Sequence, residues 1–183
     1  KLNGNWDEWQ RLEWKFRIPK DFRPSTSFCH IHQLKAQEGN NGSPLITITP
    51  RCNSNGSNRR VQVIHTGDIS ATTKGTIIDN LPLSDFEDEW IQEMHFTHDG
   101  AFSIKMTRIS DSKVLVDKAF SNIDLWRKGA ISIRNKFGIY RSFGRKMEST
   151  DDRPTNGIKD ETLQLADFKV YEKNTNPKPE SHD

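Results

Sequence analysis

Apolar and polar residues alternate along most of this chain, which is the pattern of β-strands that bury one face. The clearest run covers residues 11–18, where Leu12, Trp14, Phe16 and Ile18 alternate with charged side chains. Turn-forming Gly, Asn, Asp and Pro residues separate such runs, so the pattern predicts an all-β protein built as an antiparallel β-sandwich or jelly roll. Further strands are expected over residues 27–35, 45–51, 60–66, 76–78, 90–97, 101–109, 113–120, 130–142 and 161–172.

The composition fits one globular domain with a thin core. Of the 183 residues, 32% are hydrophobic and 28% are charged, and the ten Phe and five Trp residues argue against disorder. We expect a single domain over residues 1–173 and a disordered tail over residues 174–183. Residues 122–128 are expected to form a short helical turn. The polar stretch 145–160 is long enough to be a lid or a substrate wall.

Charge and hydropathy exclude some partners. The formal net charge of +2 is too small to favour nucleic acid, and no apolar run approaches the roughly 18 residues that span a bilayer. We therefore expect neither a nucleic-acid nor a membrane partner, and a monomer. The triplets 41–43 and 55–57 are N-glycosylation acceptors, which favours secretion. Cys29 and Cys52 lie on consecutive predicted strands, where they would form either a disulfide or two buried free thiols.

Candidate chemistry centres on His30 and His32. If residues 27–35 are a regular strand, these two imidazoles share one face while Cys29 and Ile31 share the other. Imidazole exchanges a proton most readily near neutral pH, so a pair of them on one face is notable. Three other strands offer polar rows by the same period: Arg11, Glu13 and Lys15; Thr47, Thr49 and Arg51; Lys136, Gly138, Tyr140 and Ser142.

If these strands are neighbours, the shared face is a basic groove with proton-transfer groups at its centre. Gly138, between Lys136 and Tyr140, would open space for a ligand above the sheet. Each of these features also has an ordinary structural explanation. The two histidines could be ordinary solvent-facing side chains or two ligands of a zinc site that takes a third from His65, His95, His98 or a carboxylate. Tyr140 could be a rim residue, and the row from residues 11 to 15 a solvated face with weak ion pairs.

Three segments in chain order resemble the motifs of jelly-roll polysaccharide lyases of the alginate-lyase, glucuronan-lyase and heparin-lyase-like families. Arg11-Leu12-Glu13-Trp14-Lys15 is similar to their Arg-x-Glu-x-Arg strand, and His30-Ile31-His32 to their Gln-Ile-His strand. Residues 134–142, Arg-Asn-Lys-Phe-Gly-Ile-Tyr-Arg-Ser, resemble the last motif, Tyr-Phe-Lys-Ala-Gly-x-Tyr-x-Gln. Lys15, His30 and Ser142 depart from the pattern, which puts substrate identity in question more than the reaction.

The resemblance implies a concanavalin-like β-jelly roll with a groove on its concave face, which cleaves an acidic, uronate-containing polysaccharide by β-elimination. It implies Tyr140 as the acid and a candidate base, and His32 as the base or its partner. Arg11 and His30 would neutralise the substrate carboxylate, and no metal or organic cofactor would be needed. The residues that would hold neighbouring sugars are Lys136, Arg51, Lys15, Glu13, Thr49 and Arg141.

Two other functions are compatible with parts of this pattern. A non-catalytic, lectin-like carbohydrate-binding module on the same fold would present a similar groove. A retaining glycosidase would need two carboxylates about 5 Å apart, typically close together on one strand. The acidic run 87–89 lacks alternate spacing, so the sequence does not favour a glycosidase.

Overall fold

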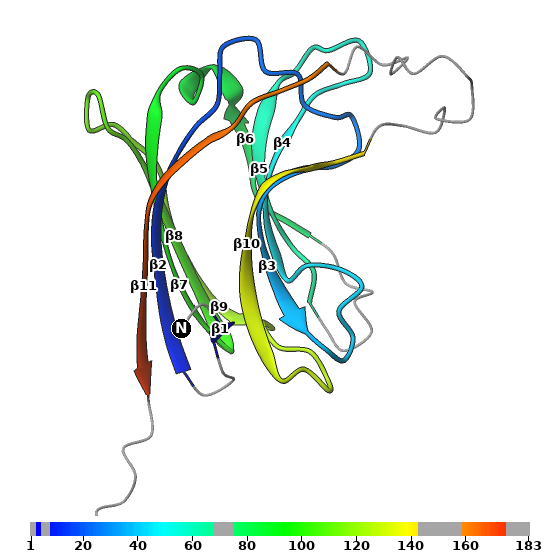
Figure 1. The fold of residues 1–183 in the computed structure, drawn as a ribbon, viewed down its shortest axis with the longest axis vertical. Helices are drawn as coiled ribbons and strands as arrows, with labels where there is room; N and C mark the ends of the chain where they lie inside the picture. The colour runs from blue at the N-terminus through cyan, green and yellow to red at the C-terminus, as the bar shows by residue number, and fades with distance from the viewer. Residues whose placement is uncertain (1–2, 5–7, 68–74, 143–158, 175–183) are drawn as a thin grey trace, which may run out of the picture.

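The protein is a sandwich of two antiparallel sheets that face each other (Figure 1). The computed structural model describes residues 3–4, 8–67, 75–142 and 159–174. One sheet has six strands in the order β1 (Asn3–Gly4), β10 (Ser132–Arg141), β3 (Cys29–Gln37), β4 (Ile46–Arg51), β5 (Arg60–His65) and β6 (Gly75–Pro82). The other has five strands in the order β11 (Gln164–Asn174), β2 (Glu8–Arg17), β7 (Trp90–His98), β8 (Gly100–Arg108) and β9 (Val114–Ile123).

The expected all-β jelly-roll sandwich is confirmed, with differences at element ends. The first long strand, β2, begins at Glu8 rather than at Arg11. The expected helical turn over residues 122–128 does not form: β9 continues to Ile123, and residues 124–127 adopt no regular secondary structure. The one helical segment among the described residues is the 3₁₀ turn η1 (Leu83–Asp85). Most of the predicted loop 145–160 and of the tail 174–183 lies outside the described residues.

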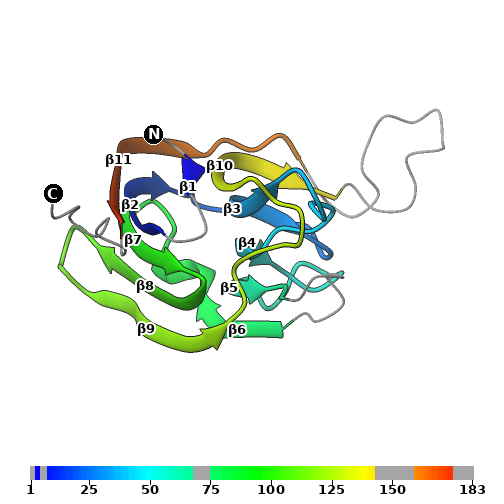
Figure 2. The same ribbon diagram turned by 90° about the horizontal axis from the view of Figure 1, so that it is seen from below.

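The core fills the space between the two sheets, which Figure 2 shows end-on. The inward row of β2 supplies Leu12, Trp14 and Phe16, all fully buried, as the alternation predicts. Burial of such side chains contributes roughly 1.5–3 kcal/mol each relative to exposure. At the β10–β11 edge, Phe168 closes the core: its ring stacks on Trp14 at 6.1 Å and meets Phe137 edge-on at 4.7 Å.

The two cysteines are buried free thiols in this structure. Burial raises the pKa of Cys29 to about 11, so its thiol stays protonated. Burial likewise raises the pKa of Cys52, whose thiol lies 3.1 Å from the carbonyl oxygen of Pro24. Neither side chain is therefore poised to act as a nucleophile. No helix in the described part of the chain is long and apolar enough to cross a membrane.

Candidate active site

The sequence predicts that His30 and His32 share a face of β3, and the structure shows that they do not. His30 lies on the outer face of the six-stranded sheet, where its Nδ1 is 2.7 Å from Oγ1 of Thr49. His32 lies opposite Ile48, a core residue, and its ring is 5.7 Å from that of Trp14. Strict alternation of side chains therefore breaks within β3, between His30 and the next outward residue, Gln33.

Pairing with β10 explains where the break falls. The register shifts between Phe137, which pairs with His32, and Tyr140, which pairs with His30. Gly138 lies within this irregularity with φ of +121°, a conformation that side chains with a Cβ rarely adopt. Along β10, Phe137 packs against the core while Tyr140 stays 62% exposed on the outside, as regular alternation requires. The register shift therefore puts their partners on opposite faces, His32 inside with Phe137 and His30 outside with Tyr140.

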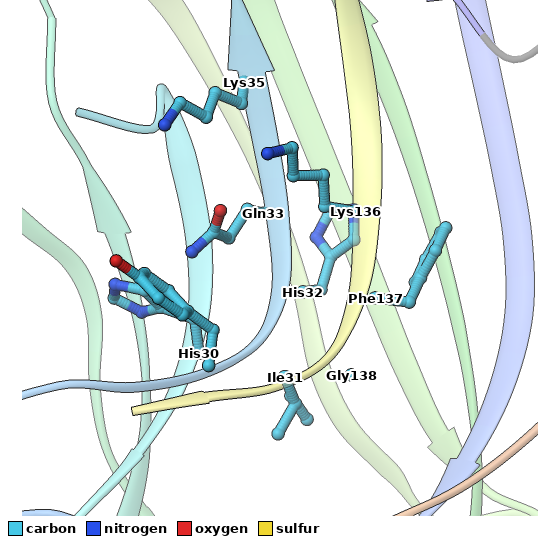
Figure 3. A pocket seen from close by; sticks show the side chains of 9 residues that line it. His30, Ile31, His32, Gln33, Lys35, Lys136, Phe137 and Gly138 are labelled. Carbon is cyan, nitrogen blue, oxygen red and sulfur yellow. The ribbon is translucent and has the colours of Figure 1, made fainter. Parts of the chain in front are cut away.

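A hollow of about 340 Å³ lies on the outer face between β3 and β10 (Figure 3). We call it the groove. In the figure, the side chains of Gln33, Lys35 and Lys136 extend to the same side of the two strands. The residues that line the groove are His30, Ile31, His32, Gln33, Lys35, Lys136, Phe137, Gly138 and Tyr140.

His30 and Tyr140 face each other across the two strands at one end of the groove. They are cross-strand partners, with ring centroids 6.2 Å apart. The ring of Phe28 stacks on His30 at 5.2 Å, and it lies 5.2 Å from that of Tyr140. An imidazole and a phenol therefore meet at one place, where one can accept a proton and the other can donate one.

The other end of the groove is cationic. Lys35 lies opposite Arg134, with Lys136 on the same strand as Arg134, and none of the three forms an ion pair with a described residue. Burial lowers the pKa of Lys35, and the positive charges of Lys136 and Arg134 lower it further. These three positive charges repel one another, and an anionic ligand would neutralise them.

Further along the sheet, Arg51 ends β4 on the face that carries Thr49. Burial lowers the pKa of Arg51, and neighbouring Arg60 lowers it further. Asp79 partly offsets this charge: its carboxylate accepts a hydrogen bond from Gln62 at 2.8 Å and lies 3.6 Å from Arg60. The positive face thus extends beyond the hollow, as the sequence predicts for Arg51.

His32 belongs to a buried polar cluster between the sheets. Its Nε2 lies 2.9 Å from Oδ1 of Asn135, and its ring is 5.1 Å from that of His95. His95 contacts the fully buried carboxylate of Glu93 through Nδ1 at 2.9 Å. Burial lowers the pKa of His32 to about 3, with a further contribution from His95. His32 is therefore neutral at ordinary pH and too weak a base for the role that the motif implies.

The row Arg11, Glu13 and Lys15 does not share the groove face, and this prediction is wrong. β2 belongs to the five-stranded sheet, and its outer side points away from the groove. There Arg11 pairs with Glu13 at 3.1 Å and lies 4.0 Å above the ring of Tyr171, while Lys15 pairs with Asp167 at 2.6 Å. This row is therefore a solvated strand face with ion pairs, which was the alternative explanation for it.

Arg141 and Thr49, which were predicted to hold neighbouring sugars, do not face open space in the groove. Arg141 pairs across the strands with Cys29, and its guanidinium donates to the carbonyl oxygen of Lys159 at 2.5 Å, so it does not line the groove. Thr49 is fully buried beneath His30, which it contacts instead of open space. Lys136, Tyr140 and His30 do lie together, as predicted.

Sequence reasoning missed three groove-side residues: Gln33, Lys35 and Arg134. In a regular strand, Gln33 and Lys35 would have faced the core with Cys29 and Ile31. The sequence did contain a sign of the break in alternation: a buried amide at Gln33 and a buried amine at Lys35 would both be unusual in a core. As for a zinc site, the described residues contain no group of three His, Cys, Asp or Glu side chains close enough to hold a metal ion.

No family model and no curated protein matches this sequence. Solved structures of alginate lyases, however, share its fold. An alginate lyase from Pseudomonas aeruginosa is 17% identical with a TM-score of 0.56, over 94% of this chain and 68% of that one. A family 7 alginate lyase in complex with substrate is 12% identical with a TM-score of 0.57, over 96% of this chain and 66% of that one. An alginate lyase from Klebsiella pneumoniae is 11% identical with a TM-score of 0.53, over 90% of this chain and 59% of that one.

These likenesses confirm the resemblance to jelly-roll polysaccharide lyases at the level of the fold. The chain spans about two thirds of the length of these alginate lyases. At such identities the fold is shared, whereas the function must be argued from the site itself.

Proposed function

We propose that the protein is a secreted polysaccharide lyase that cleaves an acidic, uronate-containing polysaccharide by β-elimination in the groove. The observation that carries the proposal is the pairing of His30 with Tyr140 across β3 and β10, in the same groove as cations that have no ion-pair partner among the described residues. The fold-level likeness to alginate lyases supports the reaction class.

The chemistry requires a base, an acid and positive charge. The base removes the proton at C5, next to the carboxylate, and the electron pair of that C–H bond forms the C4–C5 double bond. The bond from C4 to the glycosidic oxygen breaks, and the acid protonates that oxygen. A positioned acid or base contributes roughly 10²–10⁴-fold each.

We assign the base to His30 and the acid to Tyr140. His30 replaces His32 because the His32 ring packs between the sheets, against Trp14, where burial holds its pKa near 3, whereas the His30 ring lies on the groove face. Negative charge builds on the uronate carboxylate as the proton leaves. Lys136 and Lys35 line the same groove toward its other end, and each donor that reaches this carboxylate is worth roughly 3 kcal/mol of transition-state stabilisation.

The test is a panel of uronate-containing polysaccharides, assayed by the ultraviolet absorbance of the unsaturated product. We expect turnover of at least one substrate and its loss in Tyr140→Phe, with oligosaccharide affinity retained. Tyr171→Phe is the matched control, since Tyr171 is an exposed tyrosine on the other sheet, and it should keep full activity.

Two results would contradict the proposal. Binding without any unsaturated product across the panel would identify a lectin-like carbohydrate-binding module. An active Tyr140→Phe enzyme would remove Tyr140 from the chemistry.

A further inference from the structure

Two threonines of β4 form a short row of hydroxyls beneath His30. Nδ1 of His30 lies 2.7 Å from Oγ1 of Thr49, and the Thr49 hydroxyl donates to Oγ1 of Thr47 at 3.0 Å. Thr49 is fully buried and Thr47 is 4% exposed, so water competes little for these bonds. The row is built into the sheet, because Thr47 and Thr49 both alternate with core isoleucines of β4.

The protons along this row connect the hydroxyl of Thr49 to the tautomer of His30. A hydroxyl carries one proton, and that of Thr49 is used toward Thr47. With the proton of Thr49 directed at Thr47, Thr49 accepts from His30, and Nδ1 of His30 carries the hydrogen. In a neutral imidazole the lone pair then lies on Nε2. His32 has the opposite arrangement, since its Nε2 donates to the amide oxygen of Asn135.

We propose that Thr49, oriented by Thr47, is a positioning residue that holds His30 in the tautomer whose Nε2 accepts the substrate proton. The inference rests on the proposed function and assigns the removal of the proton to one nitrogen, Nε2 of His30. When Nε2 takes the C5 proton, the bond from Nδ1–H to Thr49 remains and becomes charge-assisted, so the imidazolium is stabilised without rearrangement. The C–H electron pair passes to the new double bond, and Tyr140 supplies the proton of the leaving oxygen.

Thr49→Val tests the proposal, because it removes the acceptor while nearly keeping the side-chain shape. We expect kcat to fall on the order of tenfold or more, with the affinity for an unreactive oligosaccharide unchanged. The apparent pKa of the acidic limb in the kcat/KM profile, where the base His30 loses its proton, should fall, since the imidazolium loses its partner. Lys35, Lys136 and Tyr140, the titratable groups that line the groove with the two histidines, are present in wild type and variant alike.

Thr49→Ser keeps the hydroxyl and should restore activity to within a few-fold of wild type. Thr47→Val should give an intermediate loss, because the Thr49 hydroxyl is then free to donate to His30 instead. Thr97→Val is the matched control: Thr97 is equally buried but lies on β7 of the other sheet, and its replacement should leave kcat unchanged.

Nitrogen-15 NMR of the histidine ring reads the tautomer directly and needs no turnover. In the wild type the neutral His30 ring should carry its proton on Nδ1, and Thr49→Val should give a mixture of tautomers. A wild-type ring protonated on Nε2, or a Thr49→Val enzyme with unchanged kcat and pH profile, would overturn the proposal. An inactive protein that still shows the Nδ1–H tautomer and its loss in Thr49→Val would refute the lyase assignment while upholding the role of Thr49 in setting the tautomer.

Discussion

The buried His32 should make the stability of this protein fall steeply in mild acid. In the folded state, burial lowers the pKa of His32 from 6.5 to about 3, whereas the unfolded chain regains the ordinary value. Below pH 6.5 the unfolded state therefore binds one more proton than the folded state, and each pH unit costs up to about 1.4 kcal/mol. The stability is fully present above pH 6.5 and is lost as the pH falls toward 3. Between pH 8 and pH 4.5 the loss from His32 alone is about 3 kcal/mol.

Denaturant unfolding of the wild type and of His32→Gln, measured from pH 8 to pH 4.5, isolates this contribution. Glutamine does not titrate, and its amide can still donate to Oδ1 of Asn135. All other titrating groups are shared, so the difference between the two unfolding free energies reports His32. We expect the wild type to lose about 3 kcal/mol more than the variant over this range. A constant difference between the two proteins would refute the buried, neutral state of His32.

Two further substitutions test the structure around the site. Gly138→Ala should lower the free energy of unfolding by about 2 kcal/mol because of the backbone φ of +121° alone, since no atom lies within 4 Å of the added Cβ. Gly42→Ala is the control: Gly42 also lies in open space but has an ordinary φ, so its replacement should leave thermal unfolding unchanged. Trp14→Phe removes the indole N–H that donates to the buried carboxylate of Glu93 and should cost about 3 kcal/mol in denaturant unfolding; a loss under about 1 kcal/mol would show that Glu93 does not depend on this donor.

The alternation of residues was enough to predict the fold class and most of the strands. Leu12, Trp14 and Phe16 are buried as their period of two requires, because a strand that packs on a core must place every second side chain inside. Lys136 and Tyr140 were likewise predicted to share one face of their strand, and both line the groove. These are local properties of one strand, and the order of residues determines them.

Which strands share a sheet, and where a strand changes its phase, was decided only by the tertiary structure. The charged row of β2 has the right period and chemistry for the groove, yet β2 pairs with β7 and β11 and points the other way. The bulge at Gly138 arises from pairing between β10 and β3, segments about a hundred residues apart, and it sends His32 inward while leaving His30 outside. Alternation tells which side of a strand is buried, but only the pairing of strands decides which face of the molecule the other side joins.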